Sequence, residues 1–197
     1  PGRVFRIDAR TFPDGDLDGI DAARPAMPLG SMDMVLLNPW FSTQDTVSDT
    51  SILERYDLGN NWERDEDGGF RNTGNLNTGG VPPEVLFIER ALQWVKPGTG
   101  RVGILLPDGL LGNPGDEYVR WWILRHCEVM ASVDLPVEPF KVTVKEYSLT
   151  PALPSLLMLR RRSQEELINT EHSEYKVFMA VVDRAGVDAR GNLLFQR

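Results

Sequence analysis

The chain contains almost no cysteine and no long hydrophobic run. Its one cysteine among 197 residues, Cys127, excludes an internal disulfide framework and is typical of a reducing compartment. No apolar stretch approaches the roughly 20 residues that a membrane-spanning helix needs, and no charged-then-apolar leader opens the sequence. The sequence therefore predicts a cytoplasmic protein that does not span a membrane.

Positive charge is also scarce. The formal net charge is −8, and residues 42–80 contribute most of it, with eight acidic and three basic residues. Contacts with phosphates depend on Lys and Arg. A chain of this composition would therefore not supply most of the electrostatic attraction to a nucleic acid. With 41% hydrophobic and 25% charged residues, the composition is that of a globular domain.

Residues for metal or nucleophile chemistry are few. The two histidines, His126 and His172, have no Cys, Asp or Glu at ligand spacing, which argues against a metal site. Cys127 fits a buried structural role better than a nucleophile, and Trp121–Trp122 fit packing better than a stacking platform. The run Arg160–Arg162 has two interpretations, a solvated strand end or a phosphate contact, of which we favour the first.

Hydrophobic periodicity predicts alternating strands and helices. Val85, Ile88, Leu92 and Val95 recur at helical spacing, whereas 102–106 is an unbroken apolar run typical of a buried strand. The predicted strands cover residues 3–7, 34–37, 102–106, 129–135, 155–159 and 175–182, and the predicted helices begin near Pro83 and Asp116. This order predicts an open α/β fold with a mostly parallel sheet, helices on both faces and the last two strands as an antiparallel hairpin at one edge.

Residues 42–80 differ from the rest. Eleven of these 39 positions are Gly or Asn, and the apolar residues follow no period. The stretch is therefore predicted to be a long polar loop, either a binding loop or lid, or an insertion without a function of its own.

Ligands of open α/β sheets bind beyond the carboxyl ends of the strands. The residues at these ends are Asp8, the group Asn38-Pro39-Trp40-Phe41, and Asp108. The Asn38 amide oxygen and the Pro39 carbonyl are two acceptors that could hold both hydrogens of an exocyclic amine, and Phe41 could stack on its ring. The alternative is that Asn-Pro forms only a turn.

A family resemblance extends these observations. Residues 33–41, DMVLLNPWF, resemble the DxVxxNPPF signature of amino-methylating, S-adenosylmethionine-dependent DNA methyltransferases. Residues 83–112, PEVLFIERALQWVKPGTGRVGILLPDGLLG, resemble a block of the modification subunits of type I restriction–modification systems. The similarity continues through residues 133–140, 155–159 and 175–191.

The resemblance implies a partial Rossmann-like methyltransferase fold that methylates N6 of an adenine flipped out of double-stranded DNA, with S-adenosylmethionine as cofactor and no metal. Asn38 and Pro39 would hold the target amine, with Asn38 also near the cofactor, and Phe41 and Phe140 would stack on the base. Asp8 would contact the cofactor adenine. The implied partners are the specificity and restriction subunits of the same system.

Two departures qualify the resemblance. Trp40 stands where the family usually has proline, and the family's glycine-rich cofactor loop is not found in these residues. We therefore expect residues 1–162 to be the carboxyl-side part of a catalytic domain and 163–197 an extension of it, inactive alone and a poor cofactor binder. The alternatives are a methyltransferase of RNA or protein glutamine, and a non-catalytic assembly scaffold.

Overall fold

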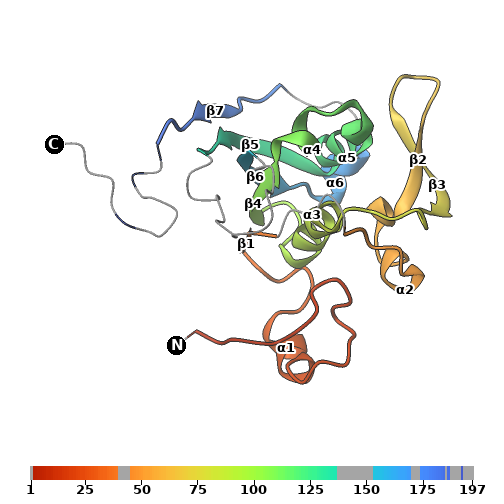
Figure 1. Cartoon of the computed structure of the whole chain (residues 1–197), viewed down its shortest axis with the longest axis vertical. Coiled ribbons are helices and arrows are strands. Elements are labelled where there is room, and N and C mark those ends of the chain that lie inside the picture. Colours follow the sequence, from red (N-terminus) through yellow and green to blue (C-terminus); the bar gives the residue numbers. More distant parts are fainter. Residues whose placement is uncertain are drawn as a thin grey trace, which may run out of the picture.

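The fold is built on a mixed β-sheet. The computed structural model describes residues 2–39, 45–136, 153–169, 174–184, 186 and 192. Its main sheet has five strands in the order β1-β4-β6-β5-β7 (Figure 1). These strands are β1 (Met34–Leu37), β4 (Arg101–Pro107), β5 (Cys127–Asp134), β6 (Pro154–Arg161) and β7 (Phe178–Val181). A separate two-stranded sheet contains β2 (Asn60–Arg64) and β3 (Phe70–Leu76).

The described part of the chain contains eight helical segments. They are α1 (Ile20–Ala26), α2 (Thr50–Leu53), η1 (Asp57–Gly59), α3 (Pro83–Trp94), α4 (Asp108–Gly112), η2 (Pro114–Asp116), α5 (Glu117–His126) and α6 (Gln164–Ile168). The helix predicted from Pro83 is confirmed as α3, and the helix predicted near Asp116 is confirmed as α5, with Asp116 at the N-cap position. None of these described helices has the length and apolar character that crossing a membrane requires.

Four of the five strands in the main sheet point the same way. β1 is parallel to β4, and β7 is parallel to β5, whereas β6 runs antiparallel to both β4 and β5. The mostly parallel sheet is thus confirmed, but the antiparallel edge hairpin is wrong, because β6 and β7 do not pair. β6 occupies an interior position, which its apolar side chains on both faces, such as Leu157 and Met158, accommodate.

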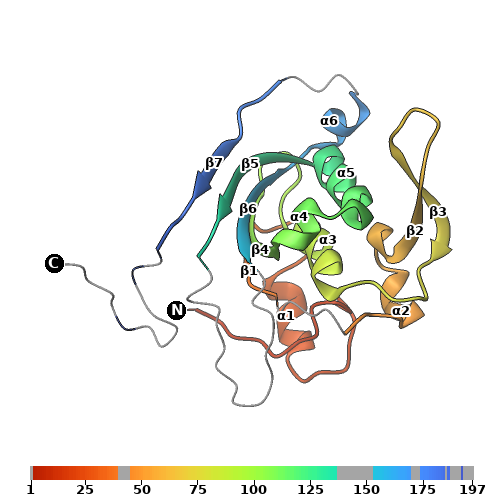
Figure 2. The same cartoon turned by 45° about the horizontal axis from the view of Figure 1, so that its top comes forward.

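The main core lies on one face of the sheet. Alternate β4 residues, Val102, Ile104 and Leu106, are fully buried there against side chains of α3, α4 and α5. Figure 2 shows these three helices on the same side of the sheet. On the opposite face Leu36 is 70% exposed. Among the described residues, the helices that pack on the sheet therefore cover one face, where the sequence predicted helices on both.

The predicted strand at residues 3–7 is wrong. The structure has no strand in this segment; instead Phe5 and Ile7 pack against a second, smaller core that includes Phe12 and Trp94. An alternating sequence forms a strand only where a neighbouring strand satisfies its backbone. No described strand pairs with residues 3–7, and the apolar side chains of this segment pack against the second core instead.

Residues 42–80 also depart from the prediction. Within the described part, 45–80, they form α2, η1 and the β2–β3 hairpin, which projects from the body of the molecule (Figure 1). Leu53 and Leu58 are fully buried in the main core. The expectation of a loop without regular structure is therefore wrong for these residues.

The Arg160–Arg162 run is structural. Arg160 forms ion pairs with Glu128 at 2.6 Å and Glu166 at 2.7 Å. Arg162 donates to the carbonyl of Cys127 at 3.2 Å. The favoured interpretation as a solvated strand end is wrong, because these guanidinium groups are engaged within the protein.

Candidate functional site

The carboxyl ends of the parallel strands form one row of residues along an edge of the sheet. Asn38 and Pro39 follow β1, and Asp108 follows β4. Asp134 ends β5, and Asp183 comes shortly after β7. Because these four strands are parallel, their ends lie at the same edge, which is where open α/β sheets bind ligands.

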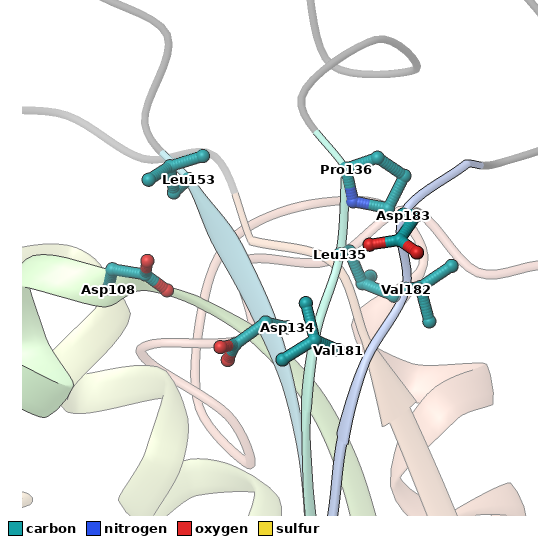
Figure 3. Close-up of a pocket in the computed structure, with 8 residues that line it drawn as sticks. All are labelled: Asp108, Asp134, Leu135, Pro136, Leu153, Val181, Val182 and Asp183. Carbon is teal, nitrogen blue, oxygen red and sulfur yellow. The ribbon is translucent and has the colours of Figure 1, made fainter.

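A pocket of about 330 Å³ opens in this row (Figure 3). Three aspartates line it, each from the end of a different strand: Asp108, Asp134 and Asp183. The remaining lining residues are apolar: Leu135, Pro136, Leu153, Val181 and Val182. Carboxylates beside an apolar wall suit a ligand that carries both a cationic or amine group and an apolar surface.

Ser155 links two of the aspartates. Its fully buried hydroxyl lies 2.7 Å from Asp108 Oδ1 and 2.9 Å from Asp134 Oδ1. A hydroxyl carries one hydrogen, so Ser155 donates to one carboxylate at a time and stays within reach of the other. Backbone bonds fix the same region, since Asp108 N–H donates to the Leu153 carbonyl and Leu135 N–H to the Pro154 carbonyl, both at 2.9 Å. The ends of β4, β5 and β6 are therefore held together.

Asn38 and Pro39 lie one strand away from this group. The register pairs Leu37 with Ile104, which places Asn38 beside Leu105 at the same edge of the sheet. Asn38 is exposed, whereas Pro39 is buried. The proline ring restricts the backbone at residue 39, directly after the exposed side-chain amide of Asn38. Neither residue lines the pocket. The roles predicted for Phe41 and Phe140 fall outside the described residues.

Asp8 is placed elsewhere. Its carboxylate accepts two hydrogen bonds from the Arg10 side chain, at 3.0 and 2.8 Å, and this arginine lowers the pKa of Asp8 below its ordinary value. The Arg10 carbonyl in turn accepts bonds from Tyr56 Oη at 2.7 Å and from Arg90 Nη2 at 3.1 Å. Asp8 is thus tied to α3 and the segment after α2, and its predicted role toward a cofactor stays a prediction.

The described residues contain no group of three His, Cys, Asp or Glu side chains that could hold a metal ion. His126 stacks on Trp122 with ring centroids 4.1 Å apart, and burial lowers its pKa. Cys127 is fully buried, as predicted, and this burial raises the pKa of its thiol. Trp121 and Trp122 pack against or within the core, as predicted.

Sequence reasoning missed Asp134, Ser155 and Asp183 as members of the row. Ser155 begins the predicted strand 155–159, which was identified only by its apolar residues. A polar side chain at the end of such a strand could have indicated a site residue. Asp183 follows β7, which the sequence paired with β6 in an antiparallel hairpin and which the structure pairs with β5. Asp108 was identified from its position after a strand, and that placement is confirmed.

Comparison with solved structures supports the fold. A class I S-adenosylmethionine-dependent methyltransferase structure from Listeria monocytogenes aligns with a TM-score of 0.53 and 17% sequence identity, over 80% of this chain and 38% of that one. The strand arrangement is therefore that of a partial Rossmann-like, class I methyltransferase fold. No family model matches the chain, and no curated protein matches it.

Two further similar structures are modification subunits of type I systems. The methyltransferase subunit from Streptococcus thermophilus aligns at 16% identity with a TM-score of 0.48, covering 83% of this chain and 32% of that one. The EcoKI modification protein aligns at 14% identity with a TM-score of 0.41, covering 86% of this chain and 29% of that one. The chain thus spans less than two fifths of the length of each of these three proteins.

Proposed function

We propose that this chain is the carboxyl-side part of the catalytic domain of a DNA adenine-N6 methyltransferase, the modification subunit of a type I restriction–modification system. The observation that carries the proposal is the placement of Asn38 and Pro39. They follow the edge strand β1 of a class I methyltransferase sheet, at the edge where the carboxylates of the neighbouring strands gather. The sequence around them resembles the amino-methylating signature.

Two oxygens would act on the target amine. The side-chain oxygen of Asn38 and the main-chain carbonyl of Pro39 would each accept one of its hydrogens, which draws the nitrogen toward tetrahedral geometry and frees its lone pair for attack. Pro39 has no N–H of its own, and its buried ring holds the backbone in place. Phe41 and Phe140 are the proposed stacking partners of the flipped base.

The negative charge at the strand ends is complementary to the positive charge of the cofactor. S-adenosylmethionine supplies an electrophilic methyl group on a sulfonium ion and also carries an ammonium group. Carboxylates such as Asp108 and Asp134 favour cationic groups, and Ser155 keeps both in place. We propose Asn38 and Asp8 as further cofactor contacts; Asp8 would have to exchange its bonds with Arg10 for bonds with the cofactor.

The acidic composition bears on the partners. With a net charge of −8, this chain would rely on other parts of an assembly for most contacts with DNA phosphates. Separate specificity and restriction subunits would supply them in a system of this type. We propose a cytoplasmic location, where such an assembly meets its DNA.

The test is methyl transfer by the chain in its natural full-length context. Labelled S-adenosylmethionine is offered with unmethylated double-stranded DNA, RNA or protein, and the product is identified by mass spectrometry after hydrolysis. We expect N6-methyladenine in DNA. The Asn38→Ala variant should lose at least 100-fold in kcat, because one of two acceptors for the amine is gone. The matched control is Asn75→Ala, an exposed asparagine in the β2–β3 hairpin.

The other outcomes separate the alternatives. If RNA or protein glutamine is labelled and DNA is not, the proposed DNA substrate is wrong, although methyl transfer from S-adenosylmethionine is still the reaction. A full-length protein that binds no cofactor by calorimetry would contradict catalysis altogether and favour an assembly scaffold. Equal activity of Asn38→Ala and Asn75→Ala would remove Asn38 from the site.

A further inference from the structure

The strand-end pocket carries negative charge that no cation in its lining offsets. Among the eight described residues that line it, three are aspartates, Asp108, Asp134 and Asp183, and none is Lys, Arg or His (Figure 3). Neither Asp108 nor Asp134 forms an ion pair with another described residue. Within the described part of the chain, the charge of these two carboxylates is therefore left for a ligand.

Ser155 holds these two carboxylates close to each other. Its fully buried hydroxyl lies 2.7 Å from an oxygen of Asp108 and 2.9 Å from an oxygen of Asp134. Because the hydroxyl has one hydrogen, only one contact is a hydrogen bond at any time, and the other brings two electron-rich oxygens together. Two like charges at this spacing repel each other, and a cation beside them reduces the repulsion. The arrangement therefore suits a positively charged ligand.

The proposed reaction removes one positive charge from the cofactor. The amine nitrogen of the target base forms a bond to the methyl carbon and loses a proton to solvent. The bond between this carbon and sulfur breaks, and the sulfur keeps the electron pair. The product, S-adenosylhomocysteine, is therefore a neutral thioether, whereas its ammonium and carboxylate groups are those of the cofactor. The two compounds differ at the site by one positive charge and one methyl group.

We propose that Asp108 and Asp134 raise the affinity of this site for the cofactor relative to its neutral product, with Ser155 as their positioning residue. This inference rests on the proposed function and adds a charge-based specificity to it. Ser155 begins β6 beside Pro154, two strands from β1 and Asn38, and neighbouring strands lie about 5 Å apart. Charges interact over roughly 10 Å at physiological ionic strength. The two carboxylates therefore act on a positive charge near Asn38 without direct contact.

The test compares two dissociation constants, measured by calorimetry with the protein in its natural full-length form. One is for S-adenosylmethionine and the other for S-adenosylhomocysteine, and the preference is the second divided by the first. A general loss of structure weakens both ligands alike and leaves this ratio unchanged. We expect Asp108→Asn to lower the ratio about threefold at a salt concentration of about 0.02 M, because one carboxylate becomes neutral. At about 1 M salt the variant and the wild type should agree, because ions screen the charge.

Two further variants separate positioning from charge. Ser155→Ala keeps both carboxylates but removes the hydroxyl that holds them, so we expect the ratio to fall about twofold at low salt. Asp67→Asn is the matched control. It removes the same charge from an exposed position in the turn between β2 and β3, and it should keep the wild-type ratio.

Three results would overturn the proposal. The first is an Asp108→Asn variant with the wild-type ratio, or with no greater change than Asp67→Asn. The second is a change that persists undiminished at high salt, which would exclude an electrostatic cause. The third is a wild-type ratio in Ser155→Ala, which would remove Ser155 as the positioning residue. Each of these leaves the proposed function standing, because methyl transfer to DNA is measured separately. A wild-type protein that binds neither compound would instead contradict the proposed function, and this inference with it.

Discussion

The guanidinium of Arg161 donates to the main-chain carbonyl of Leu92 at 2.8 Å, which joins the end of β6 to the last turn of α3. The same Nη1 donates to the Val95 carbonyl, also at 2.8 Å. The final carbonyls of a helix have no partner within the helix, and a cation is favoured beside them. Residues that are 66 or more positions apart in the chain are held together by this one side chain.

This contact predicts a stability loss on substitution. Arg161→Met removes both hydrogen bonds and leaves two carbonyls without this donor, so we expect the free energy of unfolding to fall by about 1–3 kcal/mol. Urea unfolding followed by circular dichroism measures the change. Arg101→Ala, at an exposed position on β4, is the control and should change little. Equal effects of the two variants would mean that the contact does not stabilise the fold.

Glu89 predicts a pH dependence of stability. Its carboxylate accepts the N–H groups of Asp57 and Leu58 at 3.0 and 2.9 Å, and burial raises its pKa to about 7. A carboxyl whose pKa is higher in the folded state binds a proton more tightly there. Its contribution to stability is complete below the unfolded pKa of about 4.5 and is lost as the pH rises through 7.

We therefore expect the free energy of unfolding to fall by up to about 3 kcal/mol between pH 4.5 and 8 on account of this group. Glu89→Gln should flatten the profile across that range. Glu54→Gln, at an exposed position, serves as the control and should leave the slope unchanged. If the slope survives in Glu89→Gln, this carboxyl does not cause it.

Gly59 predicts a steric effect. A Cβ at this position would overlap the Leu53 carbonyl oxygen, which is main chain and cannot rotate away. Gly59→Ala should lower the free energy of unfolding by about 2–4 kcal/mol, because α2 or η1 has to shift within the core. A Cβ at Gly115 would meet nothing within 4 Å, so Gly115→Ala should be nearly neutral. Thermal unfolding of the two variants compares them, and a neutral Gly59→Ala would contradict the close approach.

The cofactor prediction concerns residues 1–197 alone. We expect isothermal calorimetry of this chain with S-adenosylmethionine to show weak binding at best, because the glycine-rich loop is not among these residues and Arg10 occupies the Asp8 carboxylate. Asp8→Asn should then change the binding heat little. Tight, stoichiometric binding by this chain would contradict the expectation.

The local elements could be predicted because their signals are local. The helical spacing of Val85, Ile88 and Leu92 and the apolar run 102–106 depend on neighbouring residues only, and both elements are confirmed. Asp108 was identified because it follows such a run. Roles that need Phe41 and Phe140 stay predictions, since those residues lie outside the described part of the chain.

The sequence by itself determined six segments of the fold and the polar residues Asn38 and Asp108, which follow two of the strands. These segments are β1, β4, β5, β6, α3 and α5. Only the tertiary structure decided the strand order. It inserted β6 antiparallel between β4 and β5, placed β7 at the edge, and brought Ser155 between Asp108 and Asp134. The physical reason is that periodicity shows which side of a strand is apolar, whereas its neighbours follow from packing between residues far apart in the chain. For the same reason residues 3–7, strand-like in sequence, form no strand without a neighbour to pair with.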